Sequence, residues 1–181
     1  MICALALGMS LSSSFAATFS DANWISMGGI PGANGSVSAA AVDGSGNLYI
    51  CGDFTLVGNT PANHIAKWNG TSWSALGSGI GMNARFPSLY ALAVSGSNVY
   101  VGGFFDVAGG SPANYIAKWD GSTWTNLGSG MDGSVHALAV SGTDLYAAGS
   151  FTTVGGIVAS HVAKWDGSSW SALGSGMGGA P

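Results

Sequence analysis

The chain has 181 residues, enough for one domain with a hydrophobic core, and only 7% of them are charged. It contains 31 glycines, and all eight acidic residues are aspartates, a composition that disfavours long helices and favours short strands joined by turns. The net charge of −4, with only four basic residues spread along the chain, argues against nucleic-acid binding, which needs a clustered basic face.

Residues 1–17 have the features of a secretory signal peptide. An apolar run is followed by small residues, and Ser14 and Ala16 fit the −3 and −1 positions of a signal-peptidase site. The run is too short to span a bilayer comfortably, so we expect a secreted or cell-surface protein with no membrane span once the leader is removed. The basic beginning of a typical leader is missing, so either the true start lies upstream or Met1 is internal to a longer reading frame. A buried apolar strand is the alternative interpretation.

Removal of this leader would leave Cys51 as a single cysteine without an internal disulfide partner. Its counterparts in the repeats described next, Gly102 and Ala148, are small. We therefore expect a buried, unreactive thiol.

A motif with two tryptophans five residues apart occurs three times. The pairs are Trp68 and Trp73, Trp119 and Trp124, and Trp165 and Trp170. Residues 89–130 align with 135–176 without a gap, and more than half of the aligned pairs are identical. A fixed period near fifty residues indicates a repeat architecture. We name residues 37–79, 89–130 and 135–177 repeat 1, repeat 2 and repeat 3.

Each repeat is predicted to contain four short strands, which in repeat 3 are 135–140, 145–151, 161–165 and 170–173. The dipeptides Asn69-Gly70 and Asp166-Gly167 predict two-residue hairpin turns between the third and fourth strands. The connections between the second and third strands are predicted as loops, at 55–63, 106–114 and 152–160. The link between repeats 1 and 2 is five residues longer than the next one, and the extra residues fall in a loop at 80–88.

Four antiparallel strands per period are typical of a β-propeller blade. The expected fold is all-β, a kelch-like β-propeller whose domain covers residues 18–181, with three full blades and residues 19–28 as a lone outer strand. Closed propellers use about four to eight blades. We therefore expect an incomplete ring, completed by further blades of a longer polypeptide or by self-association. The recurring aromatic residues are assigned to packing between blades; they are Trp68, Trp73, Trp119, Trp124, Trp165, Trp170, Phe54, Phe105 and Phe151.

These residues also resemble known families. A hydrophobic strand ending in Gly102-Gly103, an aromatic at Tyr115 and the run Trp124-Thr-Asn-Leu127 resemble the kelch-type repeat. The phrase Asn-(His/Tyr)-Ile-Ala-Lys-Trp-(Asn/Asp)-Gly-x-x-Trp-x-x-Leu-Gly-Ser-Gly is similar to two groups of extracellular repeats. They are those of the fungal cortical cell-polarity marker family and the delta-sixty-type repeats of secreted bacterial proteins.

The resemblance covers about residues 19–177 and implies a propeller used as an extracellular display or binding scaffold. The double glycine is complete only in repeat 2, because the other repeats have Cys51-Gly52 and Ala148-Gly149. Some kelch-fold proteins are copper oxidases with tyrosine and histidine ligands on particular loops. No such set can be placed in this chain, so the oxidase activity is not carried over.

The sequence predicts neither a cofactor nor a metal site. His64 and His161 share one repeat position, so they lie on different blades and do not converge on one ion. Asp120 and Asp166 occupy hairpin turns, where a role in the turn accounts for them without acid–base chemistry. Nucleophile-elbow, P-loop and HExxH motifs are absent from the sequence. We therefore expect a protein without enzymatic activity.

The candidate ligand-binding loop is the insertion that interrupts the repeat, with Asn83, Arg85 and Phe86. Loops on a rigid scaffold commonly carry function. The sequence thus predicts a secreted or surface-exposed, non-catalytic module that binds a protein or glycan ligand through its loop face. Three alternatives stay open: a tolerated surface insertion, a lectin-like propeller with one sugar pocket per blade, and a non-catalytic portion of a secreted hydrolase or oxidase whose site lies in other blades.

Overall fold

The computed structural model describes residues 32–83 and 86–177. This part of the chain is built from antiparallel strands and turns and contains no helix, which confirms the expected all-β class. The predicted signal peptide (1–17) and the predicted lone strand (19–28) lie outside the described residues, as does Arg85.

Each repeat contributes one four-stranded antiparallel sheet, and we name these sheets 1, 2 and 3. Sheet 1 has the order β1 (Val37–Val42), β2 (Leu48–Gly52), β5 (Ile65–Trp68), β6 (Trp73–Ala75). Sheet 2 has the order β8 (Ser88–Ser95), β9 (Asn98–Phe104), β12 (Ile116–Trp119), β13 (Trp124–Thr125). Sheet 3 has the order β14 (Val135–Ser141), β15 (Asp144–Gly149), β18 (Val162–Trp165), β19 (Trp170–Ala172). Each sheet therefore keeps its strands in chain order, as a meander does.

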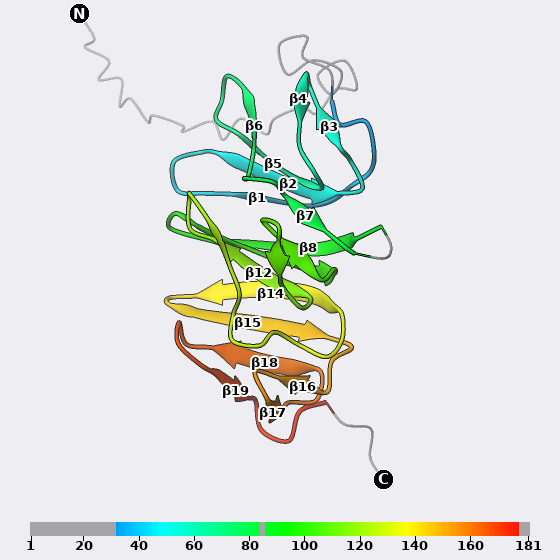
Figure 1. Ribbon diagram of the computed structural model, residues 1–181. Coiled ribbons are helices and arrows are strands. Elements are labelled where there is room, and N and C mark those ends of the chain that lie inside the picture. Colours follow the sequence, from blue (N-terminus) through cyan, green and yellow to red (C-terminus); the bar gives the residue numbers. More distant parts are fainter. Residues whose placement is uncertain (1–31, 84–85, 178–181) are drawn as a thin grey trace, which may run out of the picture.

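The three sheets stack face to face in chain order (Figure 1). The first strand of each sheet is an edge strand, and β8 contacts both β1 and β14, so the three first strands lie next to one another. The described residues form an open stack of three sheets and not a closed ring.

The two ends of the strands give the molecule two distinct sides (Figure 1). The tight turns β1–β2, β8–β9 and β14–β15 lie on the side that we name the turn side, at the left of the view. The opposite side, which we name the loop side, carries three small sheets in the connections between the main strands. Their strands are β3 (Leu56–Val57), β4 (Thr60–Pro61), β7 (Ile80–Gly81), β10 (Val107–Ala108), β11 (Ser111–Pro112), β16 (Thr153–Val154) and β17 (Ile157–Val158).

These small sheets correct the prediction that residues 55–63, 106–114, 152–160 and 80–88 are loops throughout. Each connection between a second and third strand folds into a two-stranded hairpin, and β7 of the insertion pairs with β10. The strands are only two residues long, too short to show the alternation by which strands are recognised in a sequence.

The turns between the third and fourth strands also differ from the prediction. They contain four residues rather than two, because Trp68 pairs with Trp73 and Trp119 with Trp124. The first turn residue accepts hydrogen bonds through its side chain: Asp120 Oδ1 accepts from the backbone N of Ser122 and of Thr123, both at 2.8 Å. An aspartate or asparagine that closes its own turn in this way needs no positive φ, which only the glycine takes.

The core lies between the sheets and is built from the residues that recur in register. Phe54, Phe105 and Phe151 are fully buried just after the second strands, although they were predicted to be the last residues of those strands. The tryptophans of each pair tilt against one another, with ring centroids 5.4 Å apart for Trp68 and Trp73 and 5.5 Å apart for Trp119 and Trp124.

Candidate functional site

The insertion that carries the candidate residues is tied to sheet 2 at its base. The β7 strand pairs with β10, and the backbone N of Asn83 donates to Asp106 Oδ1 at 2.9 Å. Three positions after Asn83, Phe86 has 90% of its surface exposed. The loop therefore leaves a fixed base and presents an aromatic ring to solvent.

The clamp at Asp106 reverses the arrangement found at the two equivalent junctions. There, a side chain of the linking segment holds the hairpin backbone of the following sheet. Asn34 Oδ1 accepts from Thr55 N at 2.9 Å, and Asp132 Oδ1 accepts from Thr152 N at 2.8 Å. At the insertion, the carboxylate of Asp106 precedes the β10–β11 hairpin and accepts from the backbone of Asn83 in the linking segment. The link between sheets 1 and 2 thus carries extra residues without losing its attachment.

A cavity of about 440 Å³ opens beside this loop. Its lining joins residues of sheet 1 to the insertion and to β10, and includes Asn63, His64, Met82, Phe86, Pro87 and Val107. Most of these side chains are apolar, and concave apolar sites with a few polar groups are the usual form of a ligand pocket. Two of the three candidate residues, Asn83 and Phe86, are thus placed at or beside a cavity on the loop side.

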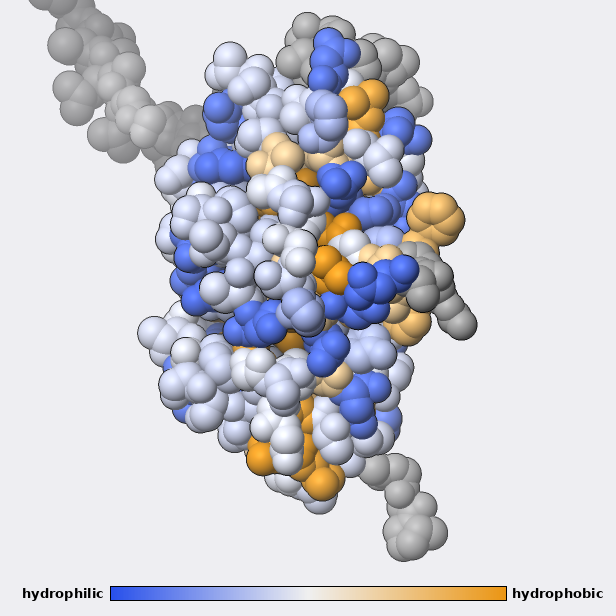
Figure 2. Space-filling model, in the orientation of Figure 1, coloured by the Kyte–Doolittle hydropathy of each residue, from blue (hydrophilic) through white to orange (hydrophobic). Residues whose placement is uncertain are grey.

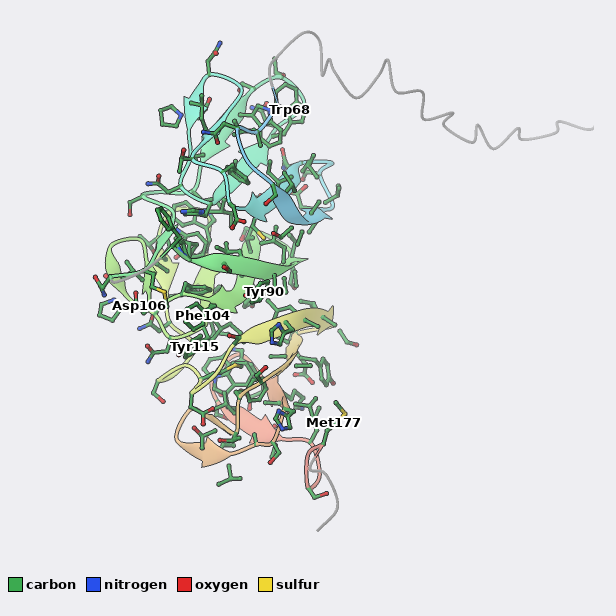
Figure 3. All side chains as sticks on the ribbon, turned by 90° about the vertical axis from the view of Figure 1, so that its right-hand side faces the viewer. Trp68, Tyr90, Phe104, Asp106, Tyr115 and Met177 are labelled. Atoms are coloured by element: carbon green, nitrogen blue, oxygen red, sulfur yellow. The ribbon has the colours of Figure 1, made fainter. Side chains whose placement is uncertain are left out.

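Further aromatic residues gather at the same end of sheet 2, at three positions that differ between the repeats (Figure 3). Repeat 2 has Tyr90, Phe104 and Tyr115 there, with the Phe104 and Tyr115 ring centroids 5.9 Å apart. Repeat 1 has serine, aspartate and histidine at these positions, and repeat 3 has histidine, serine and histidine. The aromatic side chains are therefore a property of repeat 2, which also receives the insertion.

Tyr90 reaches from sheet 2 to sheet 3. It is 41% exposed, and its ring stacks on His136 with centroids 5.1 Å apart and planes 28° apart. His136 Nε2 lies 2.9 Å from Ser150 Oγ. The sequence reasoning assigned the recurring aromatic residues to packing and did not select Tyr90 or Phe104. The signal that would have found them is their failure to recur in an otherwise regular repeat.

The backbone explains why Tyr90 and His136 point outward. The register between the first and second strands shifts between Leu89 and Ala91, and again between Val135 and Ala137. Tyr90 and His136 are the extra residues of these two β-bulges. A bulge turns a side chain away from the regular alternation and is common beside functional sites.

A second conformational feature recurs at the start of each third strand. His64, Tyr115 and His161 have φ of 66°, 65° and 67°, in the left-handed region that side-chain-bearing residues rarely occupy. Because of this conformation, the third strand of repeat 3 begins at Val162 and not at the predicted His161. His64 Nδ1 lies 3.0 Å from Gly52 O, and since a carbonyl only accepts, Nδ1 carries the hydrogen.

A second cavity, of about 460 Å³, lies on the turn side between sheets 1 and 2. It is lined by Asp43, Asn47, Tyr49, Lys67 and Trp119, among others. Asn47 Nδ2 donates to Asp43 Oδ2 at 2.7 Å, which lowers the pKa of Asp43, and Lys67 Nζ lies 5.5 Å from the centre of the Tyr49 ring. This cavity combines two aromatic rings with charged and amide groups.

Neither cavity brings together a recognisable catalytic or metal-binding set. Within residues 32–83 and 86–177, no group of three or more His, Cys, Asp or Glu side chains is placed to hold a metal ion. Cys51 is a buried free thiol, and burial raises its pKa to about 12. No helix in the same part of the chain is long and apolar enough to cross a membrane.

Comparisons with known proteins identify no family for this chain. No protein-family model matches the chain, and neither does any curated protein.

Proposed function

We propose that this protein is a non-catalytic binding module, secreted or held at the cell surface, that takes a protein ligand on the loop side of sheet 2. The observation that supports this most directly is the concentration of aromatic side chains in one repeat. Tyr90, Phe104 and Tyr115 occupy positions that carry serine, aspartate or histidine in the other repeats. Packing that is common to all repeats does not account for side chains found in only one.

The insertion adds an anchor to this surface. Phe86 is 90% exposed beside a cavity lined by Met82, Pro87 and Val107. Exposed aromatic rings next to apolar hollows are the groups that dominate binding energy at protein interfaces. The apolar character of the lining favours a protein ligand over a glycan, which would need more hydrogen-bonding groups around its hydroxyls.

The scaffold that we propose is part of a kelch-like β-propeller. Three features support this: each sheet keeps its four strands in chain order, the sheets pack face to face, and their first strands lie together. In such an arrangement the loop side of sheet 2 belongs to one of the two flat faces of the ring. A ligand bound there would also contact the neighbouring blades.

The test begins with a photo-crosslinking amino acid at position 86 and, as a matched control, at the exposed position 42 at the turn end of β1. The protein is exposed to extracellular extract, and the crosslinked partner is identified and purified. In a titration with this partner, Phe86→Ala and Tyr90→Ala should each weaken binding at least about tenfold, as expected of interface anchors. Val42→Ala should bind like the parent, and Arg85→Ala tests a second of the three candidate residues. Equal affinities of all the variants would refute the proposed site.

A second candidate, glycan binding, is favoured by the turn-side cavity, because Tyr49, Trp119, Lys67 and Asp43 together offer rings and hydrogen-bonding groups. The position of Asp43 carries Ser95 in repeat 2 and Ser141 in repeat 3. This favours a single sugar site over one site per blade. On a glycan array, Lys67→Met should abolish any signal while Lys118→Met leaves it unchanged. Equal losses would indicate one pocket per blade, and no glycan signal from the parent would dismiss this candidate.

A further inference from the structure

The same contacts join sheet 1 to sheet 2 and sheet 2 to sheet 3. In each case the segment that follows the fourth strand of one repeat receives groups of the next repeat. We name residues 76–80, 127–131 and 173–177 the trailing segments. Trp124 Nε1 donates to Leu76 O at 2.8 Å, and Trp170 Nε1 donates to Leu127 O at 2.9 Å. In repeats 2 and 3, the second tryptophan of the pair is thus bonded to the repeat that precedes it.

A second contact lies three residues further along each trailing segment. The N of Gly109 donates to Gly79 O at 2.9 Å, and the N of Gly155 donates to Gly130 O at 2.8 Å. The next residues, Ile80 and Met131, pair with the hairpin of the following repeat and are buried. At each junction, therefore, one leucine carbonyl and one glycine carbonyl accept a hydrogen bond from the next repeat, and the next repeat buries one apolar side chain.

The third trailing segment has the same backbone shape, but no group within residues 32–83 and 86–177 takes the place of these partners. Gly176 N donates to Leu173 O at 3.1 Å, as Gly79 N does to Leu76 O at 3.1 Å. Gly174 has φ of 61°, close to 59° at Gly77. A methyl group added to Gly77 would lie 3.2 Å from Trp119 Cζ3, whereas one added to Gly174 would meet nothing within 4 Å.

The burial of the side chains differs accordingly. Leu76 is 2% and Met131 is 5% exposed, but Leu173 is 37% and Met177 is 68% exposed. Figure 2 shows hydrophobic residues gathered at the end of the molecule that sheet 3 forms, where Ile157 and Val158 are exposed as well. An apolar surface with preformed acceptors is typical of an interaction site.

The first sheet shows that this surface does not fit a second copy of the chain. There the contacts toward a preceding repeat are already made by the chain itself, since Gly58 N donates to Gly32 O at 3.1 Å and Ala33 pairs with Val57. A second copy would need to release its own residues 32–33 before its sheet 1 could accept Gly176 and Met177.

We propose that trailing segment 173–177 and the outer face of sheet 3 dock a further repeat of the same kind. That repeat brings a tryptophan pair five residues apart, whose second indole N–H donates to Leu173 O. It also brings a hairpin glycine whose N–H donates to Gly176 O, and an apolar cover for Met177. The inference does not depend on the loop-side ligand, and failure of the ligand experiments would leave it standing.

The test extends the chain by one repeat. A copy of residues 132–177 is fused directly after Met177, which reproduces the Gly-Met sequence that precedes residue 132 in the natural chain. The readout is oxidation of individual methionines by dilute peroxide, followed by mass spectrometry of peptides. In the parent, Met177 should oxidise at least about tenfold faster than Met131, because susceptibility follows exposure. In the extended chain, Met177 should become as slow as Met131.

Two further proteins make the result specific. The extended chain with alanine at the added copy of Trp170 should leave Met177 reactive, because the indole that covers the segment is missing. In the parent carrying Trp170→Phe, Met131 should oxidise faster, and the oxidation rate of Met177 should not change. An extended chain that fails to fold, or that leaves Met177 fully reactive, would overturn the proposal. So would a parent that forms head-to-tail oligomers in light scattering with Met177 protected, since the occupant would then be a second copy.

Discussion

At the scale of single residues, the two tryptophans of each pair have different tasks. Both rings fill the space between sheets, but in repeats 2 and 3 the second also donates its indole N–H to a carbonyl in the preceding repeat, as Trp124 does to Leu76. A single intramolecular hydrogen bond contributes about 0.5–1.5 kcal/mol to stability, and a phenylalanine at this position has no N–H to donate. The second tryptophan therefore cannot be exchanged for another large ring without loss.

Replacing Trp124 by phenylalanine should lower the free energy of unfolding by about 1 kcal/mol, because the indole hydrogen bond to Leu76 O is lost while Leu76 O keeps its hydrogen bond from Gly79 N. Trp170→Phe should lower the free energy of unfolding by a similar amount, because it removes the hydrogen bond to Leu127 O. Urea unfolding at neutral pH measures both. Trp119→Phe is the control, since it trims the neighbouring ring without touching the Leu76 bond. Equal losses for Trp119→Phe and Trp124→Phe would assign the effect to ring volume and not to the hydrogen bond.

The sequence predicts which residues are buried more readily than it predicts their hydrogen bonds. Phe54, Phe105 and Phe151 recur in register, and recurrence of a large apolar residue predicts burial. The bond from Trp124 to Leu76 spans two repeats, and no local pattern encodes an acceptor 48 residues away. Tyr90 was missed for the opposite reason, because its outward direction follows from a bulge and not from the alternation of its strand.

At the scale of elements, the hairpins between the second and third strands of repeats 2 and 3 turn at glycine pairs. Gly109 and Gly110 join β10 to β11 and have φ of 63° and 81°, which suits the two-residue turn favoured in hairpins. Gly109 also lies under a tryptophan, because a methyl group there would come within 2.8 Å of Trp124 Cδ1. The same position in repeat 3, Gly155, would meet Trp170 Cδ1 at 2.9 Å.

Alanine at these neighbouring glycines should therefore have unequal effects. Gly110→Ala should cost about 1 kcal/mol, the penalty of a side chain at positive φ. Gly109→Ala should cost at least about 2 kcal/mol, since overpacking against Trp124 is added. Thermal unfolding of the two variants, with Gly155→Ala and Gly156→Ala as the matching pair, measures the difference. Equal losses within a pair would contradict the predicted contact with tryptophan.

The longer strands could be predicted because their alternation and turn residues are local properties, and β14 (Val135–Ser141) is only one residue longer than the predicted 135–140. The hairpins at β3–β4 and β16–β17 could not, because two-residue strands form only where a sheet edge or a neighbouring segment is supplied by the fold. Asn69-Gly70 was read as a two-residue turn because that dipeptide suits one, but its asparagine side chain accepts from Thr71 N and Ser72 N and sets a longer loop.

At the scale of the whole molecule, aspartates hold the turns between the third and fourth strands of repeats 2 and 3 and the junction between these repeats. Hydrogen bonds from the backbone of Thr123 and Ser122 lower the pKa of Asp120, and those from Ser169 and Ser168 lower the pKa of Asp166. The Thr152 hydroxyl, at 2.6 Å, lowers the pKa of Asp132 together with two backbone N–H groups. Every one of these groups acts in its ionised form.

Stability should consequently fall in acid. A carboxyl whose folded pKa lies below its ordinary value of 3.8 stabilises the fold fully above that value and loses this contribution as the pH falls through the folded pKa. Urea unfolding at pH 7 and at pH 3 should show a lower free energy of unfolding at pH 3. Asp132→Asn should narrow the difference, since its amide oxygen accepts from Thr152 N and Thr153 N at either pH. A variant with the same pH dependence as the parent would exclude Asp132 as a contributor.

The direction of the tryptophan bonds has a consequence for synthesis on the ribosome. Trp124 and Trp170 both donate to carbonyls that precede them in the chain, so the acceptor has left the ribosome before its donor. Each sheet can therefore dock on the trailing segment of a preceding repeat that has already been made. Since domains fold as units during synthesis, N-terminal parts first, this stack is built to assemble vectorially, one layer at a time.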